Sequence, residues 1–163
     1  ALGTGLGTEL GGNNVFGRLT LRGQYWWSLS KADVLTVRGE VGKLWSRDVT
    51  RVPDDFAFRT GGARTIRGYR YLGLGRKVGD AILGDSTMAV ASVEGIHYFD
   101  ERFGGALFFD VGNVAPKFSE MKLASAIGVG ARVKTPAGPL NLDLAYALRD
   151  NNVRLHFSLG IAF

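Results

Sequence analysis

The sequence contains no cysteine and has no long hydrophobic run. The absence of cysteine excludes disulfides, zinc-thiolate sites and thiol nucleophiles. A membrane-spanning helix needs about 18 or more consecutive apolar residues, and no such stretch is present. Helix-favouring runs of Ala, Leu, Glu and Lys are also missing, whereas 24 of the 163 residues are glycine. These features favour an all-β chain that forms one domain or a fragment of one.

The chain also lacks a recognisable beginning. Ala1–Gly5 resemble neither a signal peptide nor a start at Met, so we expect these residues to continue a longer protein. The net charge of +5 would suit nucleic acid or an anionic membrane surface. The basic residues are spread along the whole chain and are partly matched by acidic ones, which argues against a nucleic-acid partner.

Strict alternation of apolar with polar or small residues predicts antiparallel strands. We expect eight, at about 1–10, 18–29, 35–42, 88–99, 103–112, 123–134, 140–149 and 153–163. Six of them show this alternation, the strand at 88–99 is less cleanly patterned, and 1–10 is added as a further strand. Short turns such as 30–32, 100–102 and 135–139 join most of them. Two architectures fit this pattern: a soluble β-sandwich that acts as a binding module, and an antiparallel transmembrane β-barrel.

Three features favour the barrel. The polar face is rich in Gly and Ala with single charges, as in a crowded lumen. Strands of about ten residues match a tilted strand that crosses a bilayer. Aromatic residues lie near strand ends, where interfacial girdles form. These residues are Tyr25, Trp27, Tyr98, Phe99, Phe103, Phe157 and Phe163.

One segment, at about 48–82, interrupts the strand pattern. Its centre, Phe58–Tyr71, is cationic and rich in glycine. Loops of this length inside a compact domain are usually functional or disordered. A flexible basic surface loop and a functional loop therefore both fit the segment by itself.

Several motifs carry a resemblance to a known family. Thr60–Tyr69 resembles the R-G-Y/F loop signature of the superfamily of outer-membrane insertases and two-partner secretion transporters. Phe108–Val114 resembles its F-x-D-x-G strand, and Ser92–Glu94 its acidic strand motif. Gly130–Asp143 resembles its penultimate hairpin, and His156–Phe163 its last strand. The doubled glycine and the final H-F-S-L-G resemble the translocation and assembly module (TamA) branch more than the BamA branch.

The resemblance implies a sixteen-stranded barrel in the bacterial outer membrane, preceded by periplasmic POTRA domains. Residues 1–163 would then be the C-terminal eight strands, with the segment at 48–82 folded into the lumen. The remaining strands would come from the missing barrel half or from a second copy. A small closed barrel of eight strands with the loop outside is the alternative, because such a barrel has little interior space.

The resemblance also assigns roles to residues. Ile66, Arg67, Gly68 and Tyr69 form the lumen-loop motif, and Asp110 and Glu94 are the wall acids expected to pair with Arg67. A guanidinium suits this role because it is planar, permanently charged and can bind a carboxylate with two hydrogen bonds. The C-terminal strand signal and lateral seam comprise Phe157, Leu159, Ile161 and Phe163.

The expected function is assembly or translocation of outer-membrane or autotransporter proteins, without catalysis. We find no catalytic triad, and His97 and His156 lack the neighbours of a metal site, so no cofactor or metal is expected. The expected partners are outer-membrane lipid, client proteins and a TamB-like periplasmic protein. The alternatives are a two-partner or patatin-type secretion pore that exports one passenger, and the soluble β-sandwich.

Overall fold

The structure, a computed structural model, describes residues 2–8, 15–46, 52–53, 55–136 and 138–160, with side chains from Phe16 onward. Its elements in chain order are β1 (Leu2–Thr8), β2 (Val15–Ser28), β3 (Asp33–Ser46), β4 (Arg76–Val78), β5 (Ala81–Leu83), β6 (Thr87–Tyr98), β7 (Phe103–Ala115), the 3₁₀ helix η2 (Phe118–Glu120), β8 (Ala124–Thr135), β9 (Gly138–Ala147) and β10 (Asn152–Leu159).

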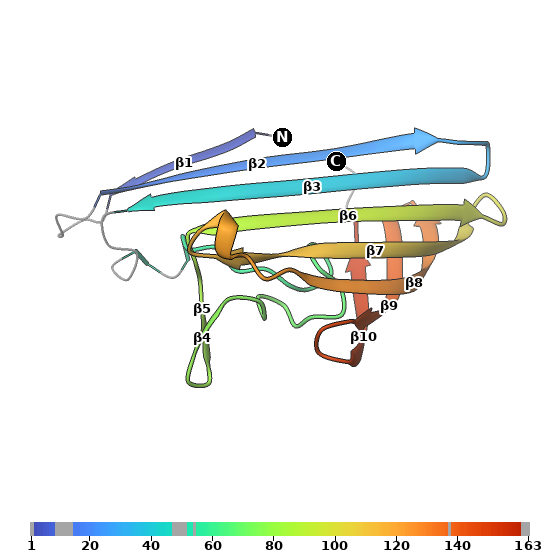
Figure 1. Cartoon of the computed structure of the whole chain (residues 1–163). Coiled ribbons are helices and arrows are strands. Elements are labelled where there is room, and N and C mark those ends of the chain that lie inside the picture. Colours follow the sequence, from blue (N-terminus) through green and yellow to red (C-terminus); the bar gives the residue numbers. More distant parts are fainter. Residues whose placement is uncertain (1, 9–14, 47–51, 54, 137, 161–163) are drawn as a thin grey trace.

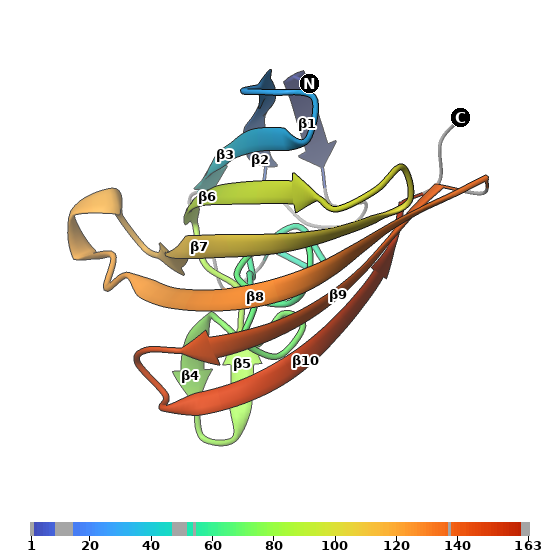
Figure 2. The same ribbon diagram turned by 90° about the vertical axis from the view of Figure 1, so that its right-hand side faces the viewer.

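Eight strands form one antiparallel sheet in the order β1-β2-β3-β6-β7-β8-β9-β10. Each strand pairs with the strand that precedes it in the sheet, as expected for successive hairpins. The all-β antiparallel fold predicted from the alternation is confirmed. The sheet is strongly curved, so that β2 and β9 face different directions (Figure 1, Figure 2).

The side chains alternate between the two faces as the sequence pattern requires. On β9, Leu142 and Leu144 are 46% and 47% exposed, whereas Asp143 and Ala145 are buried on the opposite, concave face. Outward-facing apolar side chains recur on every main strand whose side chains are described. A water-soluble protein rarely exposes an apolar surface of this extent, so this face requires an apolar environment. The soluble β-sandwich does not fit, because no second sheet covers this face in the described part of the chain.

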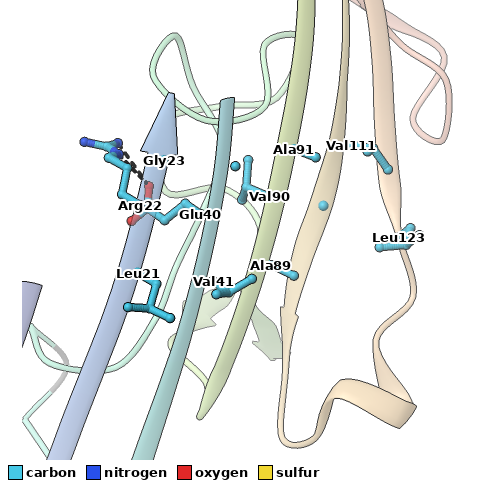
Figure 3. A pocket seen from close by; sticks show the side chains of 12 residues that line it. Leu21, Arg22, Gly23, Glu40, Val41, Ala89, Val90, Ala91, Val111 and Leu123 are labelled. Carbon is cyan, nitrogen blue, oxygen red and sulfur yellow. Dashed lines mark hydrogen bonds and ion pairs between the residues drawn. The ribbon is translucent and has the colours of Figure 1, made fainter. Parts of the chain in front are cut away.

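The outer face carries a shallow depression of about 780 Å³ (Figure 3). It lies where small residues meet in register across three strands: Gly23 on β2 pairs with Gly39 on β3, which pairs with Ala91 on β6. The ion pair between Arg22 and Glu40, at 3.0 Å, lies beside it. The depression opens toward the outside of the curved sheet.

Residues 55–86, in the segment between β3 and β6, run along the concave side of the sheet (Figure 1, Figure 2). They contribute the largest fully buried apolar side chains among the described residues: Phe58, Ile66 and Leu74 are each at most 2% exposed. The alternative of a flexible basic surface loop is therefore wrong. The prediction that Tyr98 belongs to an outer aromatic girdle is also wrong, because Tyr98 lines a cavity on the concave side of the sheet.

The sheet has two free edges, β1 and β10, which do not pair with each other in the described part of the chain. The alternative of a small closed barrel with the loop outside is therefore wrong. The sheet is open, and the loop occupies its concave side. No helix among the described residues is long and apolar enough to cross a membrane.

Candidate functional site in the inserted loop

The loop that carries Arg67 is a compact hairpin held by backbone hydrogen bonds. Thr60 and Leu74 exchange two such bonds, from Thr60 N–H to Leu74 O at 3.0 Å and from Leu74 N–H to Thr60 O at 2.8 Å. Gly61 and Gly62 adopt φ angles of 106° and 100°, which favour glycine. The Gly61 N–H donates to Oγ1 of Thr65 at 2.9 Å. This tight turn presents the motif Ile66–Tyr69 to the sheet.

Arg67 lies at the centre of the concave face, where Asp110 of β7 holds it with three hydrogen bonds. Nε of Arg67 donates to Oδ2 of Asp110 at 2.7 Å, and a terminal guanidinium nitrogen donates to Oδ1 at 2.8 Å. The Arg67 backbone N–H also donates to Oδ2, at 3.0 Å. Asp110 is fully buried and Arg67 is 4% exposed. The carboxylate thus fixes both the side chain and the backbone of the loop tip.

The other wall acid, Glu94 of β6, also binds the Arg67 guanidinium. The guanidinium carbon of Arg67 lies 3.3 Å from the ring centroid of Phe108, which adds a cation–π contact. Burial disfavours the charge of Arg67, but its hydrogen bond to Asp110 and the nearby acidic charges outweigh this effect, so the pKa of Arg67 is raised. The guanidinium is charged at every physiological pH.

Two further charged residues complete the network, and the sequence reasoning did not identify them. Asp143 of β9 accepts from Arg67 at 3.3 Å and from Arg132 of β8 at 2.6 Å. Arg132 also donates to Glu94, at 3.0 Å. The result is a closed network of two guanidiniums and three carboxylates. Such a network satisfies its members mutually, whereas deleting any one leaves a buried charge without its partner.

The remaining motif residues contact β8 and β9. A Cβ at Gly68 would lie 3.0 Å from the Ala147 backbone nitrogen and 3.3 Å from the Ala126 Cβ, and the φ of Gly68 is +88°. Only glycine suits both this close approach and this backbone conformation. Tyr69 is 3% exposed, and its hydroxyl donates to the Ser125 carbonyl at 3.1 Å. Burial raises the pKa of Tyr69.

Two contacts attach the loop to strands on either side of this centre. Arg38 of β3 donates to the Thr65 carbonyl at 3.1 Å. The Gly68 N–H donates to Nε2 of His156 on β10 at 2.8 Å. A polar cavity of about 450 Å³ lies beside the network and is lined by Arg38, Arg67 and Trp26, among others. The loop tip therefore joins strands from both halves of the curved sheet.

The residues of the predicted C-terminal signal lie apart from this network. Phe157 points outward from β10 and is 66% exposed, whereas Leu159, at the end of the strand and 44% exposed, also borders the polar cavity. Ile161 and Phe163 lie outside the described residues. Among the described residues, no group of three or more His, Asp or Glu side chains is arranged to hold a metal ion.

Comparison with known proteins gives a consistent picture. Residues 2–163 match the family model described as the Omp85 superfamily domain. The fold is similar to the crystal structure of BamA from Haemophilus ducreyi lacking POTRA domains 1–3, with a TM-score of 0.72 and 19% sequence identity. The match covers 91% of this chain and 35% of that chain, so the present chain spans about a third of its length.

Proposed function

The chain belongs to the Omp85 superfamily, and from this premise we propose that it is the C-terminal part of an outer-membrane β-barrel that helps to insert or export other proteins. One observation carries the proposal. An apolar outer face and a charged inner network occur on opposite sides of one open sheet, and a loop is clamped to the inner side. This is the arrangement required of a barrel wall in a bilayer with its lumen occupied.

The barrel proposal extends to the whole assembly. Residues 1–163 supply eight strands of a sixteen-stranded barrel, and the segment at 48–82 is its lumen loop. The free edges at β1 and β10 require further strands, because unpaired backbone groups in hydrocarbon are costly. Those strands come from the rest of a longer protein or from a second copy.

In this proposal the loop acts as an internal brace and no covalent bond is made or broken. Arg67, Asp110 and Glu94 keep the wall strands β6 and β7 in a fixed relation to the loop. The strand β10, with Phe157 and Leu159 facing lipid, forms one side of a lateral seam. Its free backbone donors and acceptors are available to pair with a strand of a client protein.

The proposed partners are compatible with this geometry. Outer-membrane lipid covers the apolar face, and client outer-membrane or autotransporter proteins engage the seam. We retain from the sequence the closer relation to the TamA branch, with Ile161 and Phe163 in the strand signal and a TamB-like protein on the periplasmic side. The bacterial outer membrane is the proposed location.

Replacing Arg67 in the full-length protein tests the proposal. Arg67→Ala leaves Asp110 and Glu94 buried without their cation, so client insertion into lipid vesicles should fall roughly ten-fold or more. Arg67→Lys should also impair insertion, because an ammonium cannot reproduce the bidentate contact. Arg64→Ala is the matched control, since Arg64 is an exposed arginine of the same loop. Insertion at the wild-type rate by Arg67→Ala protein, with its loop newly open to protease, would refute the role of the brace.

A further inference from the structure

His156 occupies an unusual position between the loop and the edge of the sheet. It lies on the concave face of β10, the last strand in the sheet order, and its register partner on β9 is Asp143. The Gly68 N–H points at its Nε2 with a distance of 2.8 Å. Because a backbone N–H can only donate, Nε2 must accept. The imidazole is therefore neutral, with its proton on Nδ1.

The neighbouring motif residues are attached to other strands. Arg67 binds side chains of β6, β7 and β9, and Tyr69 binds the backbone of β8. Gly68 extends this series to β10 through His156. Strand β10 pairs on one side only, with β9, in the described part of the chain. A hydrogen bond from the loop to this strand therefore stabilises a strand that has backbone hydrogen bonds to only one neighbour.

We propose that His156 is a positioning residue through which the loop tip holds the edge strand β10, and that it does so only as the neutral imidazole. This inference rests on the proposed function for its biological consequence, which is that the loop and the seam move together. Its physical content is independent of the client: the loop and β10 are joined when Nε2 of His156 carries a lone pair and are released when it is protonated.

The charges around His156 define its response to pH. Asp143 from β9, Asp110 from β7, Arg67 from the loop and Arg154 from β10 itself all act on it. Both carboxylates already bind guanidiniums, Asp110 through Arg67 and Asp143 through Arg67 and Arg132. A proton on His156 would add a cation to an already paired network and remove the acceptor for Gly68. Histidine is the side chain that takes up a proton most readily near neutral pH, so release should follow as the pH is lowered from 8 toward 5.

Spin labels on the full-length protein in lipid vesicles provide a direct test. Residues 1–163 contain no cysteine, so Arg70→Cys and Asn152→Cys, both at exposed positions, would label the loop and the start of β10 once any cysteine elsewhere in the protein is replaced. At pH 8 the distance distribution between the labels should be narrow. At pH 5 the ratio of narrow to broad populations should fall roughly five-fold, as expected for the loss of one hydrogen bond.

Three variants separate the proposal from a purely structural role. His156→Gln keeps an acceptor oxygen that does not titrate, so its distribution should stay narrow at both pH values. His156→Leu has no acceptor and should be broad at both. His97→Gln is the matched control: it removes the other histidine of the chain, which is exposed and paired with Asp33, and should respond to pH like the wild type.

A distribution in wild-type protein that does not change with pH would overturn the inference, and so would an unchanged pH response in His156→Gln. Client insertion measured on the same preparations distinguishes this failure from failure of the proposed function. If the labels respond as expected but insertion does not depend on His156, the link exists and its role in assembly is wrong. If insertion itself is absent from wild-type protein, the proposed function fails and the link is still measured.

Discussion

At the scale of single residues, Asp143 binds two arginines, as Glu94 does, and it is the more deeply buried of the two acids, with 5% of its side chain exposed against 15%. Asp143→Asn preserves shape but removes the charge that faces both Arg67 and Arg132. Breaking a buried ion pair on one side costs about 3–5 kcal/mol, so we expect a loss of this order in the free energy of unfolding. Urea titration in lipid vesicles measures it. Asp150→Asn, at a carboxylate with 52% exposure, should change the same quantity by at most about 1 kcal/mol.

Gly68 gives a second prediction at this scale. Gly68→Ala combines a positive φ with a close approach to Ala147 and Ala126, so it should displace the loop tip and speed protease cleavage of the loop. Gly79 is the control, because it has a φ of +59° but an added Cβ there would have no atom within 4 Å. Gly79→Ala should therefore lower the free energy of unfolding by only about 1 kcal/mol, the cost of placing alanine at a positive φ. Equal effects of the two variants would show that contact with the wall is not what selects glycine at position 68.

The sequence identified Arg67, Asp110 and Glu94 through the resemblance of their motifs, but it passed over Arg132 and Asp143. A usable signal was present. Both lie on the concave-face parity of adjacent strands joined by a short turn, and Arg132 pairs in register with Asn141, two positions from Asp143. Opposite charges at such diagonal positions are within reach of a long side chain. Pairing the two strands residue by residue from the turn at 135–138 would have predicted that Arg132 and Asp143 are neighbours on the concave face.

At the scale of elements, the loop depends on how its base rests against β3. The ring of Phe58 lies directly over Gly42, where a Cβ would collide with it. Gly42→Val should therefore push Phe58 away and destabilise the loop by about 1–3 kcal/mol, as overpacking does. Protease protection of residues 55–85 measures this effect.

Gly39→Val is the control on the same strand, because Gly39 faces outward with no atom within 4 Å of an added Cβ. It should leave the protection of the loop unchanged. Loss of protection in both variants would mean that altered strand propensity, and not contact with Phe58, is responsible.

The short strands and bridges of this loop could not be predicted from the sequence. Six of the eight main strands were recognisable because each alternates over many residues, whereas the pattern is weaker at 88–99 and at 1–10. The hairpin β4–β5 has strands of only three residues, Arg76–Val78 and Ala81–Leu83, and these are too short to display a period. The bridges between Phe58 and Asp85 and between Thr60 and Leu74 join residues 27 and 14 positions apart. Tertiary packing on the sheet selects those pairings, and no local pattern encodes them.

At the scale of the whole molecule, the outer face should obey the energetics of a bilayer. Leu144 lies in the middle of β9 and Leu148 just beyond its end, and both are exposed, at 47% and 42%. Leu144→Arg should lower the free energy of unfolding in a bilayer by about 2–4 kcal/mol and Leu148→Arg by about 0–1 kcal/mol, because the cost of a lipid-facing cation decreases toward the membrane interface. Folding titrations of the full-length protein in vesicles measure both. Equal costs would contradict a bilayer around this face.

The sequence by itself determined which face of each strand is apolar, because side chains alternate with period two whatever the strand packs against. It therefore determined the all-β architecture and the inward placement of the acids, and its motifs indicated the family. The tertiary structure decided which inward-facing charges meet, because curvature of the sheet brings β6, β7, β9 and the loop to one point. It also decided that Gly68 reaches His156, since the two are 88 positions apart in the chain and only the folded loop joins them.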